Sequence, residues 1–258
     1  MKKNILLAVL GALLFASCAS RESIVYYQDI DQQTRVVGTH NTLIQPDDLL
    51  MIIVSAQNPL AAEAYNLTTN LTVDPNDQSG TARTQQQLYL VDSEGYIDFP
   101  VLGRLLIGGK TKEQVSDEMH ALIAKDIKDA VINIRLMNYK VTVMGEVNRP
   151  GVHKINSERI TLPEALSLSG DLTKYGKRDN ILITRETTNG ITTQRVDLTS
   201  TDFMQSDYFY LKQNDIVYVE PNKTSVNSSG VGPNISIYLT VISLLLTTTA
   251  LILSNTGK

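Results

Sequence analysis

The chain has 258 residues, of which 42% are hydrophobic and 19% charged, so it can form one or two globular domains and is not a disordered tail. Its 23 Lys and Arg against 27 Asp and Glu leave a net charge of -4, without the basic excess that nucleic-acid binding requires. A single cysteine excludes a disulfide within the chain, and three histidines far apart in sequence do not form a zinc motif. We therefore expect no nucleic-acid partner, no metal and no cofactor.

The N-terminal residues have the pattern of a lipoprotein signal peptide. Two lysines precede an apolar run over 5–15 that is too short to span a bilayer, and residues 1–17 are expected to be removed. The segment from Phe15 to Cys18 resembles the bacterial lipobox, in which the cysteine thiol receives a diacylglyceryl group. Cys18 is therefore the predicted lipidation site, by which membrane lipid would hold the mature chain. The alternative is an ordinary signal peptide cleaved near Ala19, which would remove Cys18.

The body of the chain reads as β-rich, with short strands between turn signals. Apolar runs predict strands at 49–55, 131–136, 139–147 and 215–219. Two hairpins are predicted, one pairing 87–91 with 96–101 and the other pairing 181–185 with 191–196 across Asn189-Gly190. Residues 57–86 are expected to form a long loop, and 221–234 a polar linker.

Two helices are predicted by capping boxes, in which a Thr is followed three residues later by Gln or Glu. Thr111 with Gln114 begins a helix over 112–125, and Thr161 with Glu164 begins a shorter one that ends at Ser169-Gly170. Strands and helices that do not alternate regularly indicate an α+β fold.

The C-terminal segment 235–254 is predicted to be a transmembrane α-helix. Its first 19 residues carry no charge and would form roughly 28 Å of helix, about the thickness of the hydrocarbon core. Hydroxyl residues gather on one side of it and are our pore-lining or helix-contact candidates: Ser236, Thr240, Ser243, Thr247 and Ser254. The alternative is a single tail helix whose Ser and Thr side chains bond back to its own carbonyls.

The elements, in this order, resemble the bacterial outer-membrane polysaccharide export family of the Wza type. Within 24–137, the segment from Ile44 to Leu49 stands where the family's export domain has a Pro-Gly-Asp turn, with Asp47 in place of Gly. The block from Val91 to Pro100, followed by Gly103, resembles that domain's hairpin, and Lys110 to Glu113 begins the matching helix.

Residues 138–220 are similar to the soluble-ligand-binding β-grasp repeat of the same family. The similarity rests on four segments: Val143–Val147, Pro150-Gly151, Thr161–Gly170 and Leu211–Val219. Ser169-Gly170-Asp171 replaces the usual Ala-Gly-Gly. The resemblance covers about residues 26–220.

This resemblance implies an outer-membrane lipoprotein that forms a homo-oligomer ring, with a β-rich periplasmic body and one helix per subunit lining an exit channel. The channel would export capsular or extracellular polysaccharide, with an inner-membrane polysaccharide co-polymerase or chain-length regulator as partner. A tail-anchored periplasmic glycan-binding or sensor protein is the alternative. An enzyme is disfavoured, because the chain has no serine-hydrolase elbow and no phosphate loop, and turns explain its acidic residues Asp92, Glu94, Asp98 and Asp171.

Overall fold

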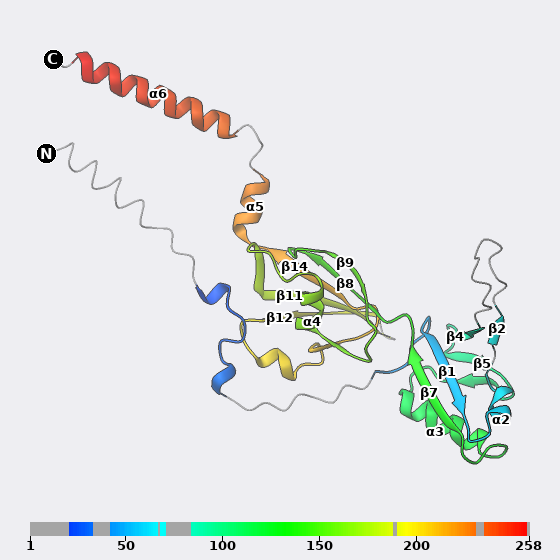
Figure 1. The fold of residues 1–258 in the computed structure, drawn as a ribbon. Coiled ribbons are helices and arrows are strands. Elements are labelled where there is room, and N and C mark those ends of the chain that lie inside the picture. Colours follow the sequence, from blue (N-terminus) through cyan, green and yellow to red (C-terminus); the bar gives the residue numbers. More distant parts are fainter. Residues whose placement is uncertain are drawn as a thin grey trace.

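The computed structural model describes residues 21–32, 42–66, 68–70, 84–187, 190–230 and 235–256 (Figure 1). Two separate hydrophobic cores define two domains. The first core is built from residues between Ile44 and Ile134, and the second from residues between Tyr139 and Val219. Leu136, where the two domains meet, packs against both.

The first domain is organised around β1 (Leu49–Ser55), the strand that the sequence predicts at the same residues. It lies between β4 (Leu88–Leu90) and β7 (Val131–Leu136), antiparallel to both. Its alternate side chains Leu50, Ile52 and Val54 are buried. The helix α3 (Lys112–Ile123) adds Val115, Met119 and Ile123 to the same core. This four-residue spacing places the three side chains on one face of the helix, which covers the sheet.

The predicted hairpin of 87–91 with 96–101 is wrong. β4 pairs with β1, while β5 (Tyr96–Phe99) forms its hairpin with β6 (Gly103–Leu106), a strand that the sequence did not indicate. The turn after Asp92 is closed by its own side chain, whose Oδ1 accepts hydrogen bonds from the backbone of Glu94 and Tyr96.

Residues 57–86 also contain more regular structure than the expected loop. A short helix α2 (Pro59–Glu63) begins after Asn58, whose side chain accepts a hydrogen bond from the Leu60 backbone at 3.2 Å. β2 (Thr68–Asn70) then pairs with β3 (Thr84–Gln86).

The second domain has a five-stranded sheet in the order β12-β11-β14-β8-β9. Its strands are β8 (Lys140–Gly145), β9 (Gly151–Lys154), β11 (Gly176–Thr187), β12 (Gly190–Val196) and β14 (Ile216–Pro221). β14 pairs in parallel with β8, and the other neighbours are antiparallel. The predicted Asn-Gly hairpin is confirmed as β11–β12.

The smaller elements of this domain pack beside the sheet. α4 (Leu162–Leu168) buries Leu162, Ala165 and Leu166, and β10 (Ile160–Thr161) pairs with β13 (Tyr210–Leu211). A short 3-10 helix, η3 (Asp202–Gln205), precedes β13. Both predicted capping boxes are confirmed, since Thr111 and Thr161 each accept from the third residue of the helix that follows and receive the reciprocal side-chain bond.

The N-terminal part of the described chain is fastened to the second domain. It contains two 3-10 helices, η1 (Arg21–Ser23) and η2 (Ile30–Gln32). Between them the backbone N–H groups of Tyr27 and Gln28 donate to the carbonyls of Leu198 and Thr199, at 3.2 and 2.8 Å. Asp29 accepts from the Thr201 backbone at 2.7 Å. Residues 21–32 therefore form a strap across this domain.

The C-terminal part consists of two helices that extend from the second domain (Figure 1). α5 (Lys223–Ser229) lies in the expected linker, where Asn222 caps it by accepting from the Ser225 backbone. α6 (Ile235–Thr256) forms where the sequence predicts a helix over 235–254. In the described part of the chain, however, no helix is long and apolar enough to cross a membrane. This finding does not support the prediction that residues 235–254 form a transmembrane segment. Ser and Thr recur throughout the apolar sequence of the helix.

Candidate functional site

The predicted lipidation site and part of the hydroxyl row lie outside what the structure describes. Residues 1–17 and Cys18 are outside the described residues. Ser236 and Ser254 are in α6, but their side chains are not described. The predicted pore-lining or helix-contact row can therefore be compared with the structure only at Thr240, Ser243 and Thr247.

The hydroxyl groups of α6 are bonded within the helix itself. Ser243 Oγ donates to the Thr240 carbonyl at 2.9 Å, and Thr247 Oγ1 lies 2.9 Å from the carbonyls of both Ser243 and Leu244. This is the bonding that the single-helix alternative predicts. The hydroxyl hydrogens of Ser243 and Thr247 are thus already donated within the helix, which makes this part of its surface less polar than the sequence suggests.

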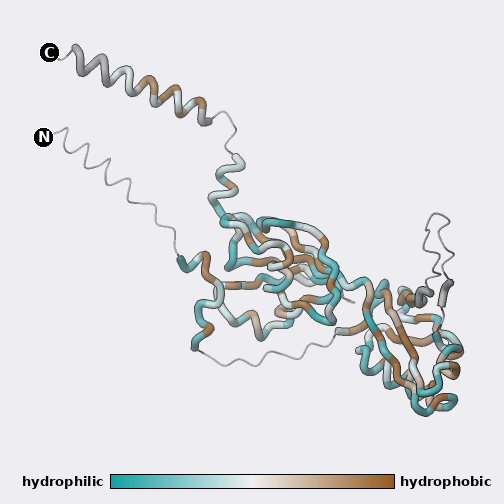
Figure 2. Tube along the Cα trace, in the orientation of Figure 1, coloured by the Kyte–Doolittle hydropathy of each residue, from teal (hydrophilic) through white to brown (hydrophobic). Residues whose placement is uncertain are grey.

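Apolar residues recur along the described part of α6 (Figure 2), and their side chains are exposed. They are between 50% and 66% exposed, and comprise Ile237, Tyr238, Leu239, Val241, Ile242, Leu244 and Leu245. An exposed apolar surface of this kind marks a contact with protein or lipid in a folded protein.

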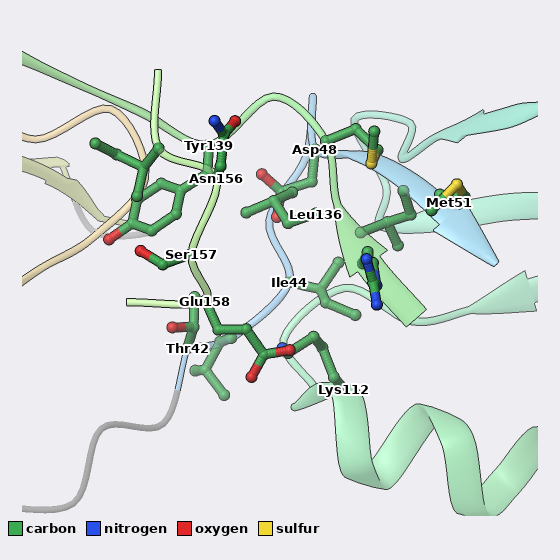
Figure 3. A pocket seen from close by; sticks show the side chains of 15 residues that line it. Thr42, Ile44, Asp48, Met51, Lys112, Leu136, Tyr139, Asn156, Ser157 and Glu158 are labelled. Atoms are coloured by element: carbon green, nitrogen blue, oxygen red, sulfur yellow. The ribbon is translucent and has the colours of Figure 1, made fainter. Parts of the chain in front are cut away.

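A cavity of about 440 Å³ lies where the two domains meet (Figure 3). The first domain contributes Ile44, Asp48 and Leu136, and the second contributes Ile155 and the polar loop 156–158. Its walls combine apolar side chains with nearly as much polar and charged surface. A volume between about 300 and 1,000 Å³ is typical of sites for small organic ligands.

Asp48 is the buried polar group of this cavity. The residue is only 2% exposed. Its Oδ2 accepts a hydrogen bond from the backbone N–H of Gln45 at 2.8 Å, while its Oδ1 has no hydrogen-bond partner. Burial raises the pKa of this carboxyl from 3.8 to about 6; the Gln45 N–H opposes the rise, and the charge of Asp47 adds to it. Asp48 thus holds the turn before β1 with one oxygen and leaves the other available.

An ion pair crosses the domain boundary beside the cavity. Lys112 Nζ, in the first turn of α3, lies 2.7 Å from Glu158 Oε1 in the loop before β10. Figure 3 shows the two side chains meeting. Arg135, at the exposed end of β7, also lines the cavity.

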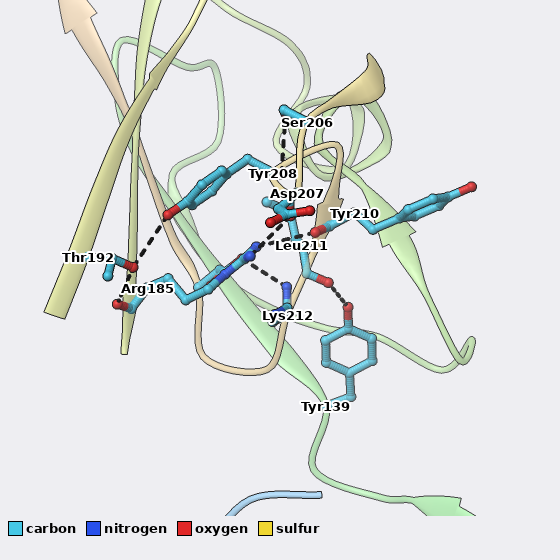
Figure 4. A network of polar contacts seen from close by, with 10 residues as sticks. Tyr139, Arg185, Thr192, Ser206, Asp207, Tyr208, Tyr210, Leu211 and Lys212 are labelled. Carbon is cyan, nitrogen blue, oxygen red and sulfur yellow. Dashed lines mark hydrogen bonds and ion pairs between the residues drawn. The ribbon is translucent and has the colours of Figure 1, made fainter. Parts of the chain in front are cut away.

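The second domain has a buried ionic network of its own (Figure 4). Arg185 and Asp215 are 4% and 0% exposed, and Arg185 Nη2 donates to Asp215 Oδ2 at 2.6 Å. Arg185 also donates to the carbonyls of Asp207 and Tyr210, at 3.0 and 3.2 Å. These bonds fix the segment between η3 and β14, so the network is structural.

Comparisons with known families cover most of the described body. Residues 37–137 match the polysaccharide biosynthesis/export protein family, and residues 139–219 match the SLBB domain. The chain belongs to the polysaccharide export family. The sequence resemblance to this family is thereby confirmed. It is not a family of enzymes, which also confirms the prediction that the chain is not an enzyme.

Two curated relatives are named EPS I polysaccharide export outer membrane protein EpsA. The protein from Ralstonia nicotianae is 32% identical over 142 residues, which is 54% of this chain and 37% of the relative. The protein from Ralstonia solanacearum is 29% identical over 207 residues, which is 76% of this chain and 52% of the relative. The chain thus spans about half the length of these relatives or less.

Asp92 and Glu94, in the turn between β4 and β5, have the geometry of a stabilised turn. Arg104 Nη2 lies 2.9 Å from Asp92 Oδ2 and 2.7 Å from Glu94 Oε2, and its guanidinium stacks on the Tyr96 ring. The pKa of Asp92 is lowered, chiefly by the Tyr96 backbone N–H. All of these groups have structural partners, as expected in a family without catalysis.

The sequence analysis did not predict the cavity, the ion pair of Lys112 with Glu158 or the buried pair of Arg185 with Asp215. Asp48 was read only as part of a turn, and Lys112 and Glu158 are 46 residues apart with no local pattern joining them. The family's Pro-Gly-Asp turn was the one available signal, because it singles out the carboxyl that the structure buries.

Proposed function

We propose that the chain is a subunit of a homo-oligomeric outer-membrane channel that exports extracellular or capsular polysaccharide. The observation that carries this proposal is the succession of an export domain and an SLBB domain in one chain, matched by relatives named as polysaccharide export outer membrane proteins. The body would lie in the periplasm, held by lipid on Cys18.

The exposed apolar surface of α6 supports an assembly of several copies. Along this helix the described apolar side chains are at least half exposed, so burial against neighbouring copies would remove them from water. The row of Ser236, Thr240, Ser243, Thr247 and Ser254 consists of small side chains that allow close helix approach. We propose that this row faces neighbouring helices or the passage that they enclose.

A periplasmic body with an export role requires a supplier of polymer at the inner membrane. We propose that this partner is a polysaccharide co-polymerase or chain-length regulator, as the family resemblance implies. This partner is expected to deliver the polymer to the channel.

The experiment is a complementation test in a strain that lacks the gene. Full-length protein should restore surface polysaccharide, and a chain ending at Gly230, without α6, should not. The native mass of the detergent-extracted full-length protein should correspond to several subunits. Normal surface polysaccharide in the deletion strain contradicts export, and a monomer by native mass contradicts the channel and favours a glycan-binding sensor.

A further inference from the structure

The cavity between the domains has no assigned role in export. Asp48 lines it, and the Oδ1 of this side chain is buried without a hydrogen-bond partner. A buried acceptor left unpaired costs free energy, and a ligand hydroxyl or amine that donates to it would recover that cost. The geometry therefore favours a ligand that carries a hydrogen-bond donor.

The walls define the rest of the ligand. Ile44, Leu50, Leu136 and Ile155 give the cavity an apolar surface. A ligand that fits must present an apolar face as well as polar edges, which is the composition of a sugar ring: C–H groups on one face and hydroxyls around the rim. A volume of about 440 Å³ accepts a ligand of this class.

The charged lining residues carry no net charge, but one of them, Arg135, can receive the carboxylate of an acidic sugar. Four charged residues line the cavity, and two of them, Lys112 and Glu158, neutralise each other at 2.7 Å. Arg135 and Asp48 are left. The guanidinium of Arg135 matches a carboxylate, which it can bind through two parallel hydrogen bonds.

We propose that this cavity binds a hexuronate unit, with its carboxylate on Arg135 and a ring hydroxyl donating to Asp48 Oδ1. The inference rests on the proposed function, which makes sugars the relevant ligand class. Because Ile44 and Asp48 belong to the first domain and Asn156 to the second, a bound sugar would contact both domains and fix their relative orientation. The relative orientation of the two domains would thus depend on whether polymer occupies the cavity.

Methionine methyl groups provide a local probe of binding. Met51 and Met137 line the cavity, whereas Met119 is buried in the first core and Met144 is on β8. In the detergent-extracted mature protein, glucuronate should shift the methyl signals of Met51 and Met137 and leave those of Met119 and Met144 in place. Glucose, which lacks the carboxylate, should bind about tenfold more weakly. A glucuronate-containing tetrasaccharide tests whether the unit is taken from a polymer chain or as free sugar.

Two variants test the named contacts. Arg135→Gln should reduce glucuronate affinity to that of glucose, while Lys125→Gln, an exposed cation near the end of α3, should leave it unchanged. Asp48→Asn keeps an oxygen to accept from the Gln45 backbone and replaces the free acceptor with a donor, so it should weaken both sugars about tenfold.

The proposal is overturned if neither glucuronate nor the tetrasaccharide shifts the Met51 and Met137 signals, or if Arg135→Gln and Asp48→Asn bind as well as the unaltered protein. These measurements use purified protein and do not depend on transport. A negative result in these binding measurements would leave the export proposal standing. The export proposal itself is tested only by the amount of surface polysaccharide in the complemented strain.

Discussion

Lys112 Nζ and Glu158 Oε1, 2.7 Å apart, join the first turn of α3 to the loop before β10 across the boundary between the two domains. Lys112 is 22% exposed and Glu158 77% exposed at the side chain, so water screens their attraction.

Breaking this interdomain pair should therefore change stability only slightly. Glu158→Gln is expected to lower the free energy of unfolding by about 0.5 kcal/mol, as for other exposed pairs. Chemical denaturation should be compared with Glu118→Gln, which removes another solvent-exposed pair, that of Glu118 with Lys110 inside the first domain. A loss several times larger for Glu158→Gln alone would show that the pair controls docking of the domains.

Breaking the pair of Arg185 and Asp215 should have a much larger effect. Asp215→Asn leaves the buried guanidinium of Arg185 without its counter-ion, and the expected loss is about 3–5 kcal/mol. Arg104→Gln, which removes an exposed ion pair, should cost no more than about 1 kcal/mol and serves as the control. Equal thermal midpoints for the two variants would contradict a structural role for the buried network.

The buried carboxyl of Asp48 should make stability depend on pH. Its pKa is raised from 3.8 to about 6, so between these values the folded protein holds a proton that the unfolded chain releases. Stability should fall as the pH rises through this window, by about 2–3 kcal/mol from this group. Chemical denaturation of Asp48→Asn, which cannot titrate at this position, gives the comparison. The difference in the free energy of unfolding between the unaltered protein and this variant should shrink as the pH rises toward 6. A difference that stays constant with pH would refute the raised pKa.

Gly145 at the end of β8 should not accept a side chain. Its φ is +92°, and an added Cβ would overlap the backbone oxygen of Val219 on the neighbouring strand β14. Gly145→Ala is expected to cost about 2–4 kcal/mol. Gly151→Ala is the matched control, because nothing lies within 4 Å of its added Cβ, and it should be nearly neutral.

Cys18 should carry the lipid anchor in cells. Cys18→Ala is expected to abolish incorporation of labelled fatty acid and to leave the precursor uncleaved. Ser17→Ala keeps a small residue before the cysteine and should still be labelled. Unchanged label in Cys18→Ala would mean that the anchor lies elsewhere.

Local signals in the sequence correctly predicted those elements that are stabilised by residues close together in the chain. The strands at 49–55 and 131–136, the two capping boxes and the Asn-Gly hairpin appear as expected. Each depends on side chains within a few residues of one another.

Local sequence signals did not predict which strands pair with one another. β4 pairs with β1, about 40 residues earlier, and not with the strand that follows it. The candidate binding cavity has the same origin, since Asp48 and Asn156 meet only after both domains have folded. The helix α6 was found, but composition alone did not show that its hydroxyls turn back to its own carbonyls.

The parallel pairing of β14 with β8 determines when the second domain can become complete. Thr142 of β8 is matched with Ile216 of β14, so the middle of the sheet is filled by the last strand to be made. Until residue 221 has been delivered, β8 and β11 each keep one open edge that can pair with other chains. During secretion, the interval before β14 arrives is therefore when this domain most needs a chaperone, and a chain interrupted before β14 should aggregate instead of persisting as a shorter folded protein.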